Sequence, residues 1–258
     1  MQINVLAIGD IVGKGGMEIL RKKLPTLQKT YGIHFTVANG ENAATLGITP
    51  KQAEFMLDMG IDCITLGNHT WSRKEILPYL DDSPNVLRPM NFAPQTAGKG
   101  WNIFERDFGS VMVINAIGRC SMDFGPDNPF LMTDKLLNEK QADIILMDFH
   151  AEATSEKMAM AYFLDGKITA IWGTHTHVQT SDAMVLPKGT GYITDLGMTG
   201  AIHSVLGVKP EQSITMFLGN PRGRYEEAPG ACKIECAIFT IDSQTKRCIN
   251  VEGLRIYD

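Results

Sequence analysis

Polar residues of the kinds that bind metals stand directly after five stretches that the sequence predicts to be buried strands. These residues are Asp10, Glu41, Asn42, Asn68, His69, His150, His175 and His177. Carboxylates, amides and imidazoles without a thiol suit borderline or hard divalent ions such as Mn, Fe or Zn. The set is too large for one mononuclear site and fits two metals that share a carboxylate bridge, for which Glu41 has two oxygens. Two ions about 3.5–4 Å apart would hold a hydroxide between them and clamp a phosphoryl group.

Several of these residues have a structural explanation when each is considered alone. Asp10 could cap a helix that follows the first strand. Asn42 and Asn68 could fill turn positions beside neighbouring glycines, and His150 could be a hydrogen-bonded structural histidine. The prediction of a metal centre therefore depends on the recurrence at five strand ends and not on any single residue.

The pair His175 and His177 gives the strongest single indication of a metal site. A regular strand would point both rings to the same face, and Gly173 gives the preceding backbone conformational freedom. Taken alone, the pair leaves a structural role equally open. His34 and His203 have no such context, and we expect them to be surface residues or to lie around the site.

The first third of the chain alternates predicted strands with predicted helices. Strands are expected at 3–8, 35–38 and 63–66, and helices at 18–30, 50–59 and 74–80. Pro25 falls inside the first of these helices. The order predicts a mostly parallel sheet between helix layers. Ligand sites of open α/β sheets lie at the carboxyl edge of the strands, which is where the polar residues fall.

The rest of the chain mixes hairpins with buried strands. Hairpins are expected at 102–117 and 183–194, helices at 133–141 and 155–164, buried strands at 143–149 and 168–172, and a closing antiparallel pair at 233–241 and 247–256. We therefore expect an α/β fold in which two mixed sheets form a sandwich with helices outside. Residues 1–258 would be one domain, in which segments near 90–132 and 201–230 could form a small cap or an interface in a homo-oligomer.

The composition narrows the class of protein and of partner. With 258 residues, 44% of them apolar and 21% charged, the chain fits a soluble globular domain. A formal net charge of −5 makes long nucleic acid a poor partner, whereas a small anion could still bind through metal charge. The five scattered cysteines do not indicate a disulfide framework. The chain shows no leader-like start and no apolar run of ~20 residues, so we expect a cytoplasmic protein without a membrane partner.

The order of the short motifs resembles the calcineurin-like metallophosphoesterase superfamily. Its elements here are Gly-Asp at 9–10, Gly-Glu-Asn at 40–42, Gly-Asn-His at 67–69, His150 at a strand end and Gly-x-His-x-His at 173–177. The chain departs from the usual pattern at Val12, where a metal-binding His is common, and at Glu41-Asn42, which replace the usual bridging Asp region. Thr70 and Thr174 replace an acidic residue and a glycine.

These departures match one bacterial subfamily, the YmdB-like phosphodiesterases, whose activity is that of a 2′,3′-cyclic-nucleotide 2′-phosphodiesterase. The matching blocks cover nearly the whole chain and are Ile8–Gly13, Asn39–Ala44, Gly67–Trp71, Asp148–Ala153, Gly173–Thr180 and Thr194–Gly200. The resemblance implies the calcineurin-like sandwich and a di-iron or dimanganese centre, with zinc as a further option. It also implies an enzyme that hydrolyses 2′,3′-cyclic nucleotides and, as a second substrate class, 3′,5′-cyclic nucleotides.

The resemblance also assigns roles to single residues. One metal would be held by Asp10, Glu41, Asn42 and His177, and the other by Glu41, Asn68, His150 and His175. His69 would donate a proton to the leaving group. Two alternatives stay open: a broader phosphoesterase acting on phosphomonoesters, phosphoproteins or RNA ends, and a regulatory protein that binds nucleotide at the metal centre with little turnover.

Three further features lie near the expected site. Glu152 and Asp195 could orient imidazole rings, or they could be surface and turn residues. The glycine-rich stretch at 13–16 lacks the spacing of a P-loop. We expect it to form a flexible lip over the metals, with Lys14 in solvent.

Overall fold

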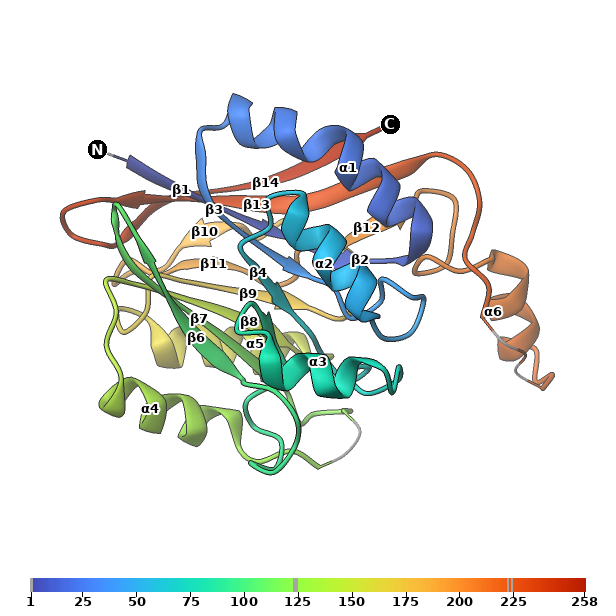
Figure 1. Cartoon of the computed structure of the whole chain (residues 1–258), viewed down its shortest axis with the longest axis horizontal. Coiled ribbons are helices and arrows are strands. Elements are labelled where there is room, and N and C mark those ends of the chain that lie inside the picture. The colour runs from blue at the N-terminus through green and yellow to red at the C-terminus, as the bar shows by residue number, and fades with distance from the viewer. Residues whose placement is uncertain (1, 123–124, 222, 224) are drawn as a thin grey trace.

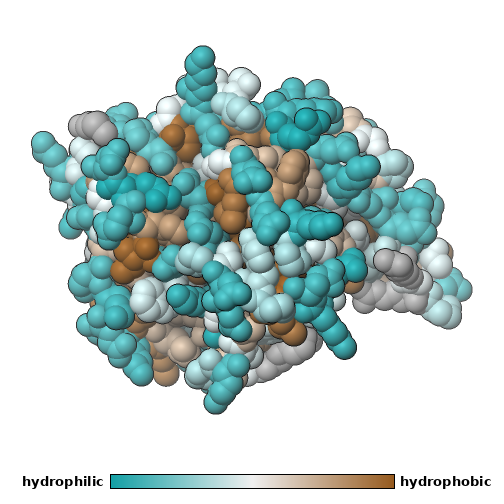
Figure 2. Space-filling view, viewed as in Figure 1, coloured by the Kyte–Doolittle hydropathy of each residue, from teal (hydrophilic) through white to brown (hydrophobic). Residues whose placement is uncertain are grey.

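The structure is a computed structural model that describes residues 2–122, 125–221, 223 and 225–258. Within these residues the strands form two sheets that pack face to face, with helices on both outer faces (Figure 1). This arrangement confirms the α/β sandwich of mixed sheets expected from the sequence. Of the described helices, none is long and apolar enough to span a bilayer. The face drawn in Figure 2 is mostly hydrophilic, with small hydrophobic areas between polar side chains.

The first sheet contains the amino-terminal strands and the closing antiparallel pair. Its strands are β1 (Gln2–Ile8), β2 (Asp10–Ile11), β3 (Ile33–Asn39), β4 (Cys63–Thr65), β5 (Val86–Leu87), β12 (Met198–Ala201), β13 (Cys232–Asp242) and β14 (Cys248–Tyr257). They lie in the order β2-β12-β13-β1-β3-β4-β5, and β14 pairs with β13. Strands β1, β3, β4 and β5 are parallel, so their carboxyl ends meet at one edge.

The second sheet contains the central part of the chain. Its strands are β6 (Trp101–Arg106), β7 (Gly109–Ile117), β8 (Ile144–His150), β9 (Ala170–Thr174), β10 (Met184–Val185) and β11 (Gly191–Ile193). They lie in the order β10-β11-β9-β8-β7-β6. Strands β7, β8, β9 and β11 are parallel, and β6 and β10 pair with β7 and β11 as antiparallel hairpins. Both expected hairpins are therefore confirmed.

The helices cover the outer faces of the sandwich. On the first sheet lie α1 (Gly13–Thr30), α2 (Pro50–Asp58) and α3 (Ile76–Asp82), and on the second lie α4 (Pro129–Glu139) and α5 (Thr154–Leu164). Helix α1 begins at Gly13, not at residue 18 as expected, and continues through Pro25. Pro25 lies on the exposed side, where water can satisfy the carbonyl group that the proline ring leaves without a helical partner.

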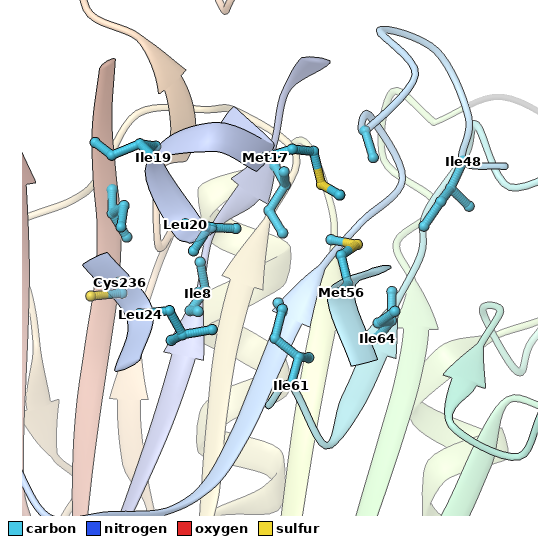
Figure 3. Close-up of a cluster of buried hydrophobic side chains, with 14 of the residues drawn as sticks. Ile8, Met17, Ile19, Leu20, Leu24, Ile48, Met56, Ile61, Ile64 and Cys236 are labelled. Carbon is cyan, nitrogen blue, oxygen red and sulfur yellow. The ribbon is translucent and has the colours of Figure 1, made fainter. Parts of the chain in front are cut away.

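The residues of β1 alternate between two cores. Ile3, Val5 and Ala7 belong to the core between the sheets, whereas Leu6 and Ile8 belong to the core under the helices. Successive side chains on a strand point to opposite faces, so one strand can contribute to both layers. Figure 3 shows the helix side of this packing, where apolar side chains of α1 and α2 meet those of the first sheet.

Residues 202–231 leave the first sheet after β12 and return to it before β13. Backbone hydrogen bonds close the neck of this segment, from Ile202 N to Ala231 O at 2.9 Å and from Ala228 N to Gly207 O at 3.0 Å. The segment, named here the 202–231 excursion, carries α6 (Pro210–Phe217), which projects to the right in Figure 1. Its positions 222 and 224 lie outside the described residues. The segment near 90–132 supplies β6 and β7 to the second sheet, and its positions 123 and 124 lie outside the described residues as well.

Candidate metal centre

Loops from both sheets bring the expected site residues together at one edge of the sandwich. The first sheet supplies Asp10 at the start of β2, Glu41 and Asn42 after β3, and Asn68 and His69 after β4. The second sheet supplies His150 at the end of β8, and His175 and His177 after β9. The side chains fall into two groups that meet at Glu41.

The first group surrounds the Nε2 atom of His150. Glu41 Oε1 lies 3.1 Å from this nitrogen, Asn68 Oδ1 lies 2.9 Å from it, and His175 Nδ1 lies 3.1 Å from it. Ligand atoms of Glu41, His150 and His175 all lie within 4.8 Å of one another. One imidazole nitrogen cannot make three hydrogen bonds, so this convergence is typical of atoms that share a cation.

The second group contains Asp10, Asn42 and His177. His177 Nε2 lies 3.7 Å from Asp10 Oδ1 and 3.2 Å from Asn42 Nδ2. Asn42 Nδ2 also donates to Glu41 Oε1 at 3.3 Å, which links the two groups. An asparagine binds a metal through Oδ1, and a half-turn of the amide would place Oδ1 where Nδ2 now lies.

The buried charges of the cluster favour a cation among them. Burial raises the pKa of Asp10 to about 6. Burial also acts to raise the pKa of Glu41, but the adjacent His150 brings this pKa down to about 2. Burial acts to lower the pKa of His150, and the carboxylates of Glu41, Asp10 and Asp148 raise it instead to about 9. Two ionised carboxylates buried side by side repel each other, and a cation beside them, either protonated His150 or a metal ion, stabilises them.

One oxygen of Asp10 supports the same conclusion. Asp10 Oδ1 is buried and accepts no hydrogen bond from any described residue. Asp10 Oδ2, in contrast, accepts the backbone N–H of His175 at 3.1 Å. Burying a carboxylate oxygen without a partner is costly unless a metal coordinates it. The donor set, its charge and its geometry therefore fit divalent metals.

His175 and His177 lie in a loop after β9, so their rings do not share a face as they would on a regular strand. Strand β9 ends at Thr174, and both histidines have positive φ angles, 100° for His175 and 62° for His177. Such angles are rare outside glycine and concentrate at functional sites. Because of this turn the two rings enter different groups: His175 contacts His150 and His177 contacts Asp10.

Buried side chains around the cluster, which the sequence did not reveal, orient His150. Its Nδ1 atom lies 2.9 Å from Thr174 Oγ1, which donates to Asp148 Oδ1 at 2.7 Å. Asn39 Nδ2 donates to Asp148 Oδ2 at 3.1 Å, and Asn39 Oδ1 accepts the backbone N–H of Glu41 at 3.1 Å. The only sequence signal for this network is a charged residue, Asp148, inside an apolar strand.

The other histidines have similar supports. Glu152 Oε2 lies 3.2 Å from His175 Nε2. Of the two roles considered for Glu152, an imidazole contact or a surface position, the structure shows the imidazole contact. His177 Nδ1 lies 3.1 Å from the carbonyl oxygen of Leu206 in the 202–231 excursion. A proton held on Nδ1 by this carbonyl leaves Nε2 unprotonated and facing Asp10.

Asp195 supports the histidine loop through its backbone. Its Oδ2 atom accepts the N–H of Thr176 at 3.3 Å and pairs with Lys157 Nζ at 2.7 Å. Both side chains of this ion pair are buried. The structure therefore gives Asp195 a positioning role for the loop between His175 and His177, without a contact to either ring.

The glycine-rich stretch at 13–16 is not a flexible lip. It forms the first turn of α1, and the N–H of Gly15 donates to Glu227 Oε1 at 2.7 Å. The carboxylate from the 202–231 excursion thus satisfies the helix N-terminus, where Val12 provides no side-chain cap. Lys14 is exposed as expected, and so are His34 and His203.

His69 lies at the wall of a cavity of about 250 Å³ beside the cluster. Its backbone N–H donates to Glu41 Oε2 at 3.0 Å, and its Nε2 atom lies 3.4 Å from Asn68 Nδ2. The same cavity is lined by Asn42, His175 and His177. The cavity therefore connects His69 with both groups of candidate ligands.

Replacing Gly67 by Ala should disturb this cluster. A Cβ atom at residue 67 would overlap His150 Nε2 and Glu41 Oε2, so the two candidate ligands would have to separate. We expect metal affinity, measured by titration of metal-free protein, to fall by about 10–100-fold. As a control, Gly223→Ala should keep wild-type affinity, since a Cβ there meets no described atom within 4 Å. Equal affinities for both variants would contradict the prediction.

Similarity to known proteins extends over nearly the whole chain. A family model described as YmdB-like protein matches residues 6–254. A 2′,3′-cyclic-nucleotide 2′-phosphodiesterase of Bacillus subtilis is 44% identical over 261 residues, which cover 99% of this chain and 98% of the relative. The crystal structure of a novel phosphatase from Mycoplasma pneumoniae has a TM-score of 0.94 at 35% identity, with coverage of 100% and 94%. That of a hypothetical protein from Thermus thermophilus has a TM-score of 0.93 at 39% identity, with coverage of 99% and 100%. The similarity confirms the resemblance noted in the sequence and the prediction of an enzyme.

Proposed function

Since this chain belongs to the YmdB-like family, we propose that it is a metal-dependent phosphodiesterase that hydrolyses cyclic nucleotides. The preferred substrates would be 2′,3′-cyclic nucleotides, with 3′,5′-cyclic nucleotides as a second class. The observation that carries this proposal is the convergence of candidate ligands and His69 on one cavity. The similarity to the Bacillus subtilis phosphodiesterase over 99% of the chain supports the choice of substrate.

The candidate ligands would hold two metal ions, with iron preferred and manganese or zinc as substitutes. The group of Asp10, Asn42 and His177 would hold one, and the group of Asn68, His150 and His175 the other, with Glu41 between them. When bound, two cations lower the pKa of a water molecule and neutralise charge on the phosphoryl oxygens. The separation of the contacts into two groups that share Glu41 supports this division.

The remaining chemistry belongs to side chains of the pocket. A ribose alkoxide is a poor leaving group, so its departure requires a proton, and an imidazole can supply one near neutral pH. We assign this step to His69, which lines the cavity beside Asn68. The hydrogen bond from the His69 backbone to Glu41 ties its position to the carboxylate shared by both groups.

The 202–231 excursion would act as a small cap on a single domain. It contacts the candidate centre through the carbonyl group of Leu206 and lines the same cavity as the candidate ligands. A broader phosphatase activity is the second candidate function. The solved relative from Mycoplasma pneumoniae is described as a phosphatase. Since phosphatases cleave phosphomonoesters, a monoester belongs among the substrates tested.

The test is incubation of iron- or manganese-loaded protein with 2′,3′-cyclic AMP, 3′,5′-cyclic AMP, bis-p-nitrophenyl phosphate and p-nitrophenyl phosphate. We expect 2′,3′-cyclic AMP to give 3′-AMP, because the 2′ ester bond breaks, and chromatography separates this product from 2′-AMP. Protein treated with a chelator should be inactive until metal is restored. Faster turnover of the monoester would favour the broader phosphatase, and no turnover of any ester would refute the enzyme assignment.

A further inference from the structure

The cavity beside the candidate metal centre has two walls of different chemistry. Glu41, Asn42, His69, His175 and His177 supply polar groups to the lining and are called here the polar wall, and Val12, Thr45 and Leu46 line the cavity as well. The other wall comes from the 202–231 excursion and includes Leu206, Val208, Met216, Phe217 and Tyr225. We propose that this apolar wall binds the nucleobase of the substrate, with Phe217 as the stacking platform. This proposal rests on the proposed function. The apolar wall would recognise the substrate through its base, without touching its phosphate.

The arrangement of the walls fits the shape of a cyclic nucleotide. In such a molecule the cyclic phosphate and the base are attached to different positions of the ribose, so a charged end and a flat apolar end are presented together. The cavity, about 250 Å³, lies just below the range of about 300–1,000 Å³ usual for ligand pockets. A cavity of this size has room for one nucleotide.

Phe217 is unusual among the apolar residues of this wall because it is 82% exposed. It ends α6, and Leu206, which is 49% exposed, lines the same cavity. An exposed aromatic ring that lines a cavity loses contact with water when a base stacks on it, and stacking of this kind adds to binding. The ring is thus available to a ligand without any rearrangement of the core.

The apolar wall is held at a fixed place relative to the polar wall. The carbonyl group of Leu206 lies 3.1 Å from His177 Nδ1, and Glu227 Oε1 accepts the N–H of Gly15 at 2.7 Å. Ala228 N donates to Gly207 O at 3.0 Å across the neck. These anchors join the neck of the excursion to a candidate ligand and to α1, so the excursion leaves and re-enters the fold at a fixed place beside the polar wall.

A wall made mainly of carbon recognises the face of a base more than its edge. Every base has a π-face, so stacking tolerates all four bases. We therefore expect the 2′,3′-cyclic forms of AMP, GMP, CMP and UMP to be hydrolysed with kcat/KM values within about tenfold of one another, the purines being favoured by their larger rings.

The experiment compares two variants of neighbouring exposed residues on two substrates. Phe217→Ala removes the platform, and Leu218→Ala is the control, since Leu218 is 75% exposed and is not among the described residues that line the cavity. The substrates are 2′,3′-cyclic AMP and methyl riboside 2′,3′-cyclic phosphate, in which a methoxy group replaces the base. We expect Phe217→Ala to raise KM for cyclic AMP about tenfold and to leave the methyl riboside unchanged.

Each other outcome overturns the inference. If Phe217→Ala changes both substrates equally, Phe217 supports the site as a whole and does not bind the base. If neither substrate changes, or if Leu218→Ala has the same effect as Phe217→Ala, the wall is not a base site. Hydrolysis of the base-free substrate by the wild type separates these results from failure of the proposed function. If the wild type hydrolyses neither substrate, the proposed function fails, and the base site fails with it.

Discussion

The variant His69→Gln should lose about 10²–10⁴-fold in kcat for 2′,3′-cyclic AMP, which is the usual contribution of a positioned proton donor. Glutamine can fill the space and form hydrogen bonds, but it cannot release a proton to the leaving oxygen. The hydrogen bond from residue 69 to Glu41 uses the backbone, so the variant keeps it. We therefore expect the metal content, measured by plasma mass spectrometry, to equal that of the wild type.

The matched control for this prediction is His34→Gln. His34 is exposed and lies at the amino end of β3, at the opposite end of that strand from Glu41. Its replacement should leave both kcat and metal content unchanged. A His69→Gln protein that has lost metal would show that His69 is a ligand, and one with wild-type kcat would show that the proton comes from elsewhere.

Replacing Lys157 by Met should lower the free energy of unfolding by about 3–5 kcal/mol, because it leaves Asp195 as a buried charge without a partner. Lys157 and Asp195 are 2% and 1% exposed in their side chains and lie 2.7 Å apart. Asp195 also accepts the N–H of Thr176 between the two loop histidines. Urea unfolding of the metal-free protein, followed by circular dichroism, would measure the loss.

An exposed pair of similar geometry gives the control. Lys167 Nζ lies 2.9 Å from Asp134 Oδ1, but these side chains are 45% and 44% exposed, so Lys167→Met should cost less than about 1 kcal/mol. Adding Asp195→Asn to Lys157→Met should restore much of the loss, since no charge then stays buried. Equal losses at both lysines would contradict the argument from burial.

The alternation of strands and helices could be predicted because it depends on local patterns. Apolar strands such as β1 and β8 end in glycine or polar residues, and the carboxyl ends of parallel strands meet at one edge. Those two rules are sufficient to group the eight candidate residues from the sequence alone. Residues that act through short loops at strand ends are thus accessible to sequence reasoning.

Other features were missed because their partners are distant in the chain. Gly15 lies in a helical turn whose N–H groups face Glu227, 212 positions away, so the local glycine content suggested a loop. The ion pair of Lys157 with Asp195 and the network around Asp148 likewise join residues that are far apart in the sequence. Helix α6 was missed because glycine and proline surround it, and it is only eight residues long.

The two ends of the 202–231 excursion lie beside each other at its neck, where Ile202 pairs with Ala231. Insertions or deletions beyond such a neck do not change the spacing of the strands that flank it, since the entry and exit points stay together. The segment can therefore change in length and composition during evolution while β12, β13 and the ligand loops stay the same. If the excursion binds the base as proposed, exchange of the part between Leu206 and Glu227, which keeps both of these anchors, would transfer substrate preference without rebuilding the sandwich.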